Sequence, residues 1–236
     1  PTMTRFASLA ALLLALLAFG CQPPAPLPPP PPPVPQGPPP TPRIALVLGG
    51  GAARGFAHIG VIRALEQEKI PVDLVVGTSV GSLIGAIYAA DRNSFELEWT
   101  AFQLEKEDLF DFGVLNAVTG MGFAKGDKLE AWVQKHIKTQ DIEKLKLPFA
   151  AVATDLNWGY KVVLDRGSVA KAVRASSAIP GVFQPVAHQG KILVDGGVVD
   201  NIPISVARAK GADLVIAVDI SANLGNPNIT NLLGVS

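Results

Sequence analysis

A serine flanked by glycines is the first candidate for chemistry in this 236-residue chain. Ser79 is the centre of Gly77-Thr-Ser-Val-Gly81, which fits the pattern G-x-S-x-G. An apolar run at 72–76 precedes the motif, and apolar residues at helical spacing follow from Val80. The pattern predicts a sharp strand-to-helix turn that presents the serine hydroxyl as a nucleophile. The helix N-terminus behind Ser79 favours developing negative charge.

A glycine-rich stretch at 49–55, GGGAARG, offers a second requirement of acyl hydrolysis. Its backbone N–H groups can stabilise an oxyanion, and Arg54 adds a fixed positive charge. Two nucleotide-binding patterns compete for this stretch, and neither fits well. Counted from Gly49, the last glycine of G-x-G-x-x-G falls on Arg54. A P-loop needs Lys and then Ser or Thr where Phe56 and Ala57 stand.

The serine also needs a proton acceptor, and the three histidines fit this role poorly. In α/β hydrolases the acid and then the histidine follow the serine, but here the acid candidate Asp195 comes after the last histidine, His188. His58 lies near the glycine-rich stretch and is expected to be structural. His136 lies on an amphipathic segment and is expected at the surface.

Asp195 is the better candidate for the base. It ends an apolar run at 192–194, and strand ends are where α/β folds gather their sites. Gly196 and Gly197 would let the backbone turn so that the carboxylate reaches the serine. With an ordinary pKa of ~3.9, the carboxylate needs burial or hydrogen bonding to assist proton transfer. The alternative is that Asp195 only caps an Asp-Gly turn.

Together and in this order, the glycine-rich stretch with its Arg-Gly, G-T-S-V-G and Asp-Gly-Gly resemble the patatin-like phospholipase family. The stretches RASSAIPG at 174–181 and DNIP at 200–203 are also similar to that family, and the resemblance spans 43–220. The chain looks most like small bacterial members related to the catalytic domain of neuropathy target esterase. The resemblance implies a Ser79–Asp195 dyad without histidine.

The resemblance also implies an oxyanion hole made largely by the N–H groups of Gly50 and Gly51. Ala52 stands where many members have a third glycine, so the hole could use a slightly different set of amides. Arg54 matches the basic residue of the motif, with a role in loop geometry or phosphate contact. The residues expected to support the motifs are Arg54, Gly55, Gly77, Gly81, Gly196 and Gly197.

Strand and helix patterns alternate from residue 43 onward, which indicates an α/β fold. We expect three layers, α/β/α, with a largely parallel central sheet of the patatin-like type. Strands are expected at 44–48, 72–76, 149–155, 161–164, 192–194 and 214–220, and helices at 56–69, 80–87, 94–104, 127–137, 169–177 and 204–210. Among the aromatic residues of 94–126, five could border an acyl groove or belong to the core, namely Phe95, Trp99, Phe102, Phe110 and Phe112.

Residues 1–21 have the pattern of a signal peptide. Arg5 precedes an apolar run at 9–19 that is too short for an ordinary membrane span. Cys21, the only cysteine in the chain, follows this run at a position resembling the lipidated cysteine of bacterial lipoproteins. An ordinary cleaved signal peptide or an uncleaved anchor remain alternatives. Gln22 resembles an outer-membrane sorting signal.

Residues 22–42 hold 14 of the 21 prolines and predict a polyproline spacer, with a proline-recognition ligand as the alternative. Residues 43–236 form the expected acyl hydrolase domain, which we expect to be truncated at its C-terminus because the sequence stops at what looks like the opening of a helix. Arg5 is the single charge before residue 43, leaving 19 Lys and Arg against 20 Asp and Glu. This balance lacks the basic patch of a nucleic-acid-binding protein.

The sequence thus predicts a serine esterase of phospholipase A or lysophospholipase type, tethered to the bacterial cell envelope by a lipid anchor. Its expected partners are a phospholipid or other acyl ester and the membrane. No metal or cofactor motif is visible. The alternatives are a hydrolase of thioesters or short soluble esters, and a non-catalytic lipoprotein that binds lipid or a protein partner.

Overall fold

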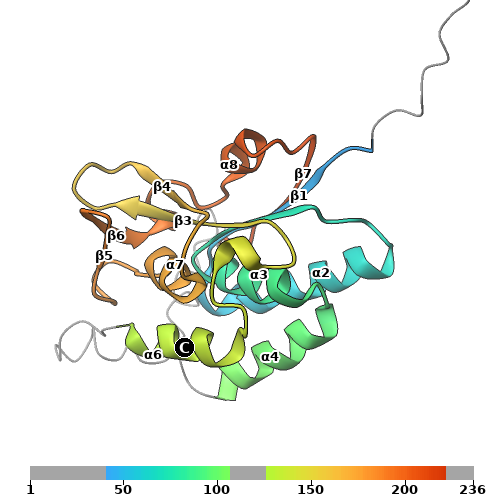
Figure 1. Ribbon diagram of the computed structural model, residues 1–236, viewed down its shortest axis with the longest axis horizontal. Coiled ribbons are helices and arrows are strands. Elements are labelled where there is room, and N and C mark those ends of the chain that lie inside the picture. Colours follow the sequence, from blue (N-terminus) through green and yellow to red (C-terminus); the bar gives the residue numbers. More distant parts are fainter. Residues whose placement is uncertain (1–40, 107–125, 222–236) are drawn as a thin grey trace, which may run out of the picture. The chain divides into compact units, whose positions relative to one another are not determined.

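The computed structural model describes residues 41–106 and 126–221 (Figure 1). Within these ranges seven strands form one sheet, in the order β5-β6-β3-β2-β1-β7, with β4 also paired to β3. The strands are β1 (Ile44–Leu48), β2 (Leu74–Thr78), β3 (Phe149–Asp155), β4 (Lys161–Leu164), β5 (Val186–His188), β6 (Lys191–Asp195) and β7 (Leu214–Val218).

The neighbouring strands β7, β1, β2 and β3 are mutually parallel, as the alternation of strands and helices predicts. The other three pairings are antiparallel, namely β3 with β4, β3 with β6, and β5 with β6. Two of these pairs are joined by short turns, which can connect antiparallel strands only. The sheet is therefore parallel from β3 through β2 and β1 to β7, and β3 pairs in the antiparallel sense with both β4 and β6.

Helices cover both faces of the sheet, so the fold has three layers (Figure 1). The larger helical layer contains α2 (Phe56–Gln67), α3 (Val80–Asp91), α4 (Ser94–Lys106), α6 (Asp127–His136) and α7 (Val169–Ser176). The opposite face carries α8 (Ile204–Ala209). Alternate residues of β1 serve the two layers: Leu46 and Leu48 join the core under the larger layer, and Ala45 and Val47 join the core under α8. Strands buried on both faces read as continuous apolar runs, which is why β1 was evident in the sequence.

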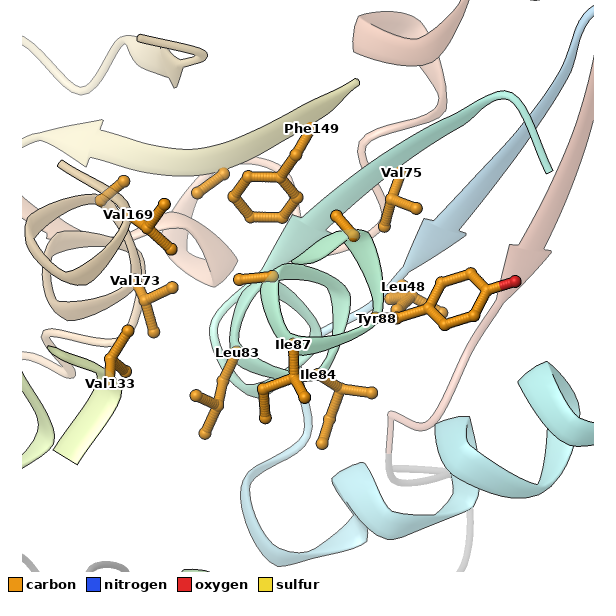
Figure 2. Packing of buried hydrophobic residues seen from close by; sticks show 14 of the residues in the cluster. Leu48, Val75, Leu83, Ile84, Ile87, Tyr88, Val133, Phe149, Val169 and Val173 are labelled. Atoms are coloured by element: carbon orange, nitrogen blue, oxygen red, sulfur yellow. The ribbon is translucent and has the colours of Figure 1, made fainter. Parts of the chain in front are cut away.

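Helix α3 lies at the centre of the larger core (Figure 2). Every residue from Val80 to Ala90 is buried. Its side chains Leu83 and Ile87 pack among residues of the sheet and of α7, including Phe149 and Val173. A helix that is apolar all round is stable only when it is enclosed in this way. The position of the residue before α3, Ser79, is consequently held by the core.

Three short 3₁₀ helices complete the described part, η1 (Ala52–Gly55), η2 (Ile142–Lys144) and η3 (Gly196–Val198). Most predicted elements are found within two residues of their expected ends. The three-residue strand β5 was not predicted. Within the described ranges, no helix combines the length and apolar character that a membrane crossing needs. Residues 1–21 and most of the spacer at 22–42 lie outside the described residues.

Candidate active site

Two strands meet end to end along one edge of β3, and this brings Ser79 and Asp195 together. The last residue of β2, Thr78, pairs with Val152, and the last residue of β6, Asp195, pairs with the next residue, Ala153. Strand β4 pairs with both Val152 and Ala153, so it occupies the other edge of β3. The carboxyl ends of β2 and β6 therefore point at each other across the position of the serine.

Ser79 occupies the predicted strand-to-helix turn and is buried. Its backbone has φ 54° and ψ −127°, a conformation that side chains rarely adopt. The hydroxyl Oγ donates a hydrogen bond of 2.6 Å to Oδ2 of Asp195. The structure thus holds a strained backbone at the one residue whose hydroxyl meets the carboxylate.

The turn around Ser79 leaves no room for a side chain at either glycine of the motif, Gly77 or Gly81. A Cβ on Gly81 would lie 2.1 Å from the carbonyl oxygen of Leu48, and a Cβ on Gly77 would lie 2.4 Å from that of Gly81. Both contacts are with backbone, which cannot move aside easily. The glycines of G-x-S-x-G are thus needed for close approach of β1, β2 and α3.

Asp195 is buried and its carboxylate has two hydrogen-bond donors. Oδ2 accepts from Ser79, and Oδ1 accepts from the N–H of Gly197 at 2.7 Å. A Cβ on Gly196 would lie 2.1 Å from the carbonyl oxygen of Val152, so the turn after Asp195 also requires glycine. Burial raises the pKa of Asp195, and the hydrogen bonds from Ser79 and Gly197 oppose that rise. A raised pKa makes the carboxylate a stronger base than a free one.

Ser176, at the end of α7, is a site residue that the sequence analysis did not single out. Its Oγ accepts a hydrogen bond from the backbone N–H of Ser79 at 2.9 Å and donates one to the carbonyl oxygen of Val152 at 2.6 Å. The side chain is fully buried. Ser176 thus ties the backbone of Ser79 to β3. The only sequence signal for Ser176 was the stretch RASSAIPG at 174–181, which is similar to the family but to which no role was assigned.

The glycine-rich stretch lies beside Ser79, but the amide of Gly50 is already in use. Its N–H donates to the carbonyl oxygen of Asn201 at 3.3 Å, and Nδ2 of Asn201 donates to the carbonyl oxygen of Gly50 at 3.2 Å. The expectation that Gly50 offers a free N–H is therefore not met. Asn201, another residue without a predicted role, clamps this peptide from the DNIP segment.

The next two amides are better placed to receive an anion. Gly51 and Ala52 line the cavity beside Ser79 and Asp195. Among the described residues, no acceptor takes the N–H of Gly51 or Ala52. Ala52 has φ 50°, in the left-handed region that favours glycine. This conformation explains physically why a glycine would suit the position.

Arg54 is exposed at the rim of the same cavity. Its Nε lies 3.4 Å from the carbonyl oxygen of Gly51, so the side chain leans over the glycine-rich stretch. Hydrogen bonds from Ser221, and to a smaller extent the charge of Arg54, lower the pKa of nearby Asp219. The next residue, Gly55, is buried, and a Cβ at this position would lie 2.2 Å from a methyl group of Val80. The position therefore has no room for a side chain.

No histidine belongs to the described site. His58 is fully buried, and its Nε2 bonds to the carbonyl oxygen of Gly49 at 2.8 Å. Burial lowers the pKa of His58, and the bond to Gly49 partly offsets this. His136 is half-buried and stacks on Trp132 with ring centroids 4.2 Å apart. His188 lies in β5 and is not among the residues that line the cavity.

The site opens into a cavity of about 450 Å³. Apolar side chains of Ile179, Pro180 and Val198 share its wall with the glycine-rich stretch, Ser79 and Asp195.

Phe95, Trp99 and Phe102 do not line the cavity and are exposed on α4, so neither the core nor the groove interpretation holds for them. Phe110 and Phe112 lie outside the described residues. Within residues 41–106 and 126–221, no group of three His, Cys, Asp or Glu side chains is arranged to hold a metal ion.

Residues 46–208 match the sequence model of patatin-like phospholipases. The chain belongs to the patatin-like phospholipase family. The family and fold class predicted from the sequence are thereby confirmed, and the family is one of lipid ester hydrolases.

Curated relatives of this patatin-like domain include proteins from fungi, bacteria and animals. Lysophospholipase NTE1 of Mycosarcoma maydis is 39% identical over 181 residues, covering 76% of this chain and 10% of that protein. An uncharacterized NTE family protein of Mycobacterium bovis is 37% identical over 187 residues, covering 79% of this chain and 51% of that protein. Patatin-like phospholipase domain-containing protein 6 of Homo sapiens is 39% identical over 189 residues, covering 76% of this chain and 13% of that protein. The chain therefore spans from about a tenth to about half of these relatives.

A solved structure has the same fold. VipD from Legionella pneumophila superposes with a TM-score of 0.50 at 16% identity, covering 70% of this chain and 47% of that one. At this identity the likeness concerns the fold of the patatin-like domain alone.

Proposed function

We propose that this chain is a serine lipid acyl hydrolase that works with a Ser79–Asp195 dyad. The observation that carries the proposal is the 2.6 Å hydrogen bond from Oγ of Ser79 to Oδ2 of Asp195. The two residues are 116 positions apart and are both buried at strand ends beside a cavity. A structural hydrogen bond would need neither the strained backbone of Ser79 nor an opening to solvent.

In the acylation step, Oγ of Ser79 attacks the carbonyl carbon of the ester while Asp195 takes the hydroxyl proton. The tetrahedral intermediate collapses when the bond from carbon to the leaving oxygen breaks. Asp195 then donates the proton to that oxygen, and the alcohol leaves. The raised pKa of Asp195 supports both halves of this proton transfer. Deacylation repeats the sequence with water, which Asp195 deprotonates, and releases the fatty acid.

The N–H groups of Gly51 and Ala52 stabilise the oxyanion in this proposal. Both lie on the cavity wall, and their amides have no acceptor among the described residues. Gly50, whose amide bonds to Asn201, holds the loop instead. Charge from Arg54 and the N-terminus of α3 adds to the positive potential at the same place.

The substrate in this proposal is a phospholipid or lysophospholipid acyl ester. Two relatives carry the words lysophospholipase and phospholipase in their names. Ile179, Pro180 and Val198 give the cavity an apolar wall that suits an acyl chain. Thioesters and short soluble esters are the competing substrates, and a lipid-binding protein without activity is the competing class.

The test combines covalent labelling with a substrate panel. The wild-type chain should react with a fluorophosphonate and hydrolyse lysophospholipid, and Ser79→Ala should lose both. Ser177→Ala is the control, because its Oγ is buried beside the site without a partner among the described residues. Undiminished labelling of folded Ser79→Ala would refute the nucleophile. Preference for thioesters or short esters would change the substrate, and no turnover of any ester would favour the binding protein.

We also propose that Cys21 carries a lipid that tethers the domain to the cell envelope, the outer membrane in particular. The support is the position of the cysteine after the apolar run and before Gln22. The proline-rich residues 22–42 would then act as a spacer. Metabolic labelling with a fatty acid should mark the wild type, and Cys21→Ser should move the protein out of the membrane fraction. An unlabelled wild type would refute the anchor.

A further inference from the structure

The turn between β3 and β4 carries large apolar side chains in solvent. Trp158 and Tyr160 are 72% and 70% exposed, and Leu156 is half-exposed. The backbone N–H of Leu156 donates to the carbonyl oxygen of Ile192 at 2.8 Å, which places exposed Ile192 beside the turn. Residues 156–160 and Ile192 are called the aromatic hairpin below.

The fold does not depend on these side chains. The hairpin is closed by backbone groups, because Asp155 N–H donates to the carbonyl of Tyr160 and Gly159 N–H donates to that of Asp155, both at 2.8 Å. Oδ1 of Asp155 also accepts from the N–H of Asn157 at 3.1 Å. Exposed tryptophan and tyrosine side chains that the turn does not need for its own closure indicate an interaction with something outside the folded core.

The aromatic hairpin lies at the catalytic end of the sheet. Asp195 pairs with Ala153, and β3 continues from there to Asp155 before the hairpin begins. At ~3.3 Å per residue, the tip extends roughly 10 Å past the dyad in the direction in which β2 points. In Figure 1 the hairpin is the loop joining β3 to β4, at the end where β5 and β6 also turn.

An ion pair joins the base of the hairpin to the segment at the mouth of the cavity. Val198 lines the cavity and is exposed, and Val199 beside it is also exposed. The following residue, Asp200, accepts a 2.7 Å bond from Nζ of Lys161, the first residue of β4. The segment that carries the mouth is thereby joined to the base of the hairpin.

We propose that the aromatic hairpin docks into the interfacial layer of the lipid aggregate that holds the substrate. This inference rests on the proposed lipid hydrolysis. Trp and Tyr combine an apolar ring with a polar group, and this suits the boundary between headgroups and acyl chains. Docking at this end of the sheet brings the cavity mouth to the lipid surface.

Charge contributes little to this docking. The two lysines at the base of the hairpin are both paired, Lys161 with Asp200 at 2.7 Å and Lys191 with Asp155 at 3.2 Å. The contact is therefore apolar, and the hairpin inserts equally into zwitterionic and anionic vesicles and does so in high salt.

Fluorescence of the full chain tests insertion at the hairpin itself, so any lipid anchor elsewhere does not confuse the result. The chain has three tryptophans, and Trp132 is buried. In a Ser79→Ala background, Trp99→Phe leaves Trp158 as the exposed reporter, and Trp158→Phe leaves Trp99. Phosphatidylcholine vesicles with brominated acyl chains should quench Trp158 and shift its emission to shorter wavelength, and should leave Trp99 unchanged. An unquenched Trp158, or equal quenching of both, overturns the proposal.

Kinetics provide the second readout. Trp158→Ser with Tyr160→Ser should lower kcat/KM on phosphatidylcholine vesicles roughly tenfold or more, since two large apolar side chains no longer enter the lipid. The rate on a monomeric short-chain ester should stay unchanged. Phe95→Ser is the matched control, because Phe95 is 71% exposed but follows the end of α3 that lies away from Ser79. Equal vesicle rates for the double variant and the wild type overturn the proposal. A wild type that hydrolyses no ester would instead refute the proposed hydrolase function. The quenching experiment would still show whether the hairpin inserts into lipid.

Discussion

Asp195 is a buried carboxylate with one hydroxyl and one amide as hydrogen-bond partners, and its burial brings a catalytic advantage together with a cost in stability. Burial raises its pKa. Because the folded pKa exceeds the unfolded one, the native state holds the proton more strongly between the two values. Stability consequently falls as pH rises through that window, and the deficit remains at neutral pH.

Asp195→Asn should therefore separate activity from stability. The rate of ester hydrolysis should drop ~10²–10⁴-fold, as is usual when a general base is lost. The melting temperature at pH 7 should equal or exceed that of the wild type, and this advantage should vanish at acidic pH. Steady-state kinetics and thermal unfolding followed by circular dichroism measure both quantities. A stable variant with near-normal activity, beside an inactive His188→Ala enzyme, would contradict the dyad.

Two adjacent serines differ sharply in what they contact. Ser176 bonds to Ser79 and Val152, and the hydroxyl of Ser177 is buried with no partner among the described residues. Ser176→Ala should lower kcat by roughly tenfold to hundredfold with little change in KM, because the nucleophile loses its fixed position. Ser177→Ala should leave kcat unchanged. The expectation fails if Ser176→Ala alters stability alone, or if both variants lose activity equally.

At the scale of elements, His58 connects α2 to the strand end that carries the glycine-rich stretch. A carbonyl oxygen only accepts, so the proton of His58 sits on Nε2, toward Gly49. The other nitrogen, Nδ1, is buried and has no partner among the described residues. Protonating it would bury an unpaired N–H and a charge.

This arrangement predicts a pH-dependent stability. The folded pKa of His58 is below the unfolded value, so the unfolded state binds the proton first as pH falls. The stabilisation is present above about pH 6.5 and is lost as pH drops toward the folded pKa. Urea unfolding at a series of pH values should show this loss for the wild type and a flatter profile for His58→Gln, a side chain that does not titrate. Parallel profiles would show that His58 does not contribute.

At the scale of the whole molecule, the two halves of the site depend on different parts of the sheet. Ser79 is held by a helix buried on all sides, whereas β6 meets β3 through three residue pairs and otherwise pairs with the three-residue β5. Regions with few pairings open more readily than the core. Enzymatic activity should therefore be lost at a lower urea concentration than the far-UV circular dichroism signal, which reports the secondary structure of the whole domain. Coincident midpoints would show that β5 and β6 unfold only with the rest.

Sequence reasoning located the elements well because their signals are local. Strands β3 and β4 have their predicted ends, and buried runs such as β1 are unmistakable. Strand β5 was missed because three residues are too few to show a pattern. The exposed aromatic residues of α4 were misjudged because helical spacing alone does not tell which face turns inward.

The chemical candidates were predictable and their contacts were not. Motif spacing indicates Ser79 and Asp195, but their approach depends on β2 and β6 sharing one edge of β3. The same holds for Ser176 and for the bond that occupies the amide of Gly50. These contacts join residues far apart in the chain, and local patterns carry no record of them.

The end-to-end meeting of β2 and β6 has a practical consequence. A chain divided between α4 and α6 would carry Ser79 on one fragment and β3 with Asp195 on the other. Each fragment alone would be inert toward esters. Hydrolysis would return only when β2 docks beside β3 through their four parallel pairs. Fused to two interacting partners, such fragments would make turnover of a fluorogenic ester a reporter of the encounter.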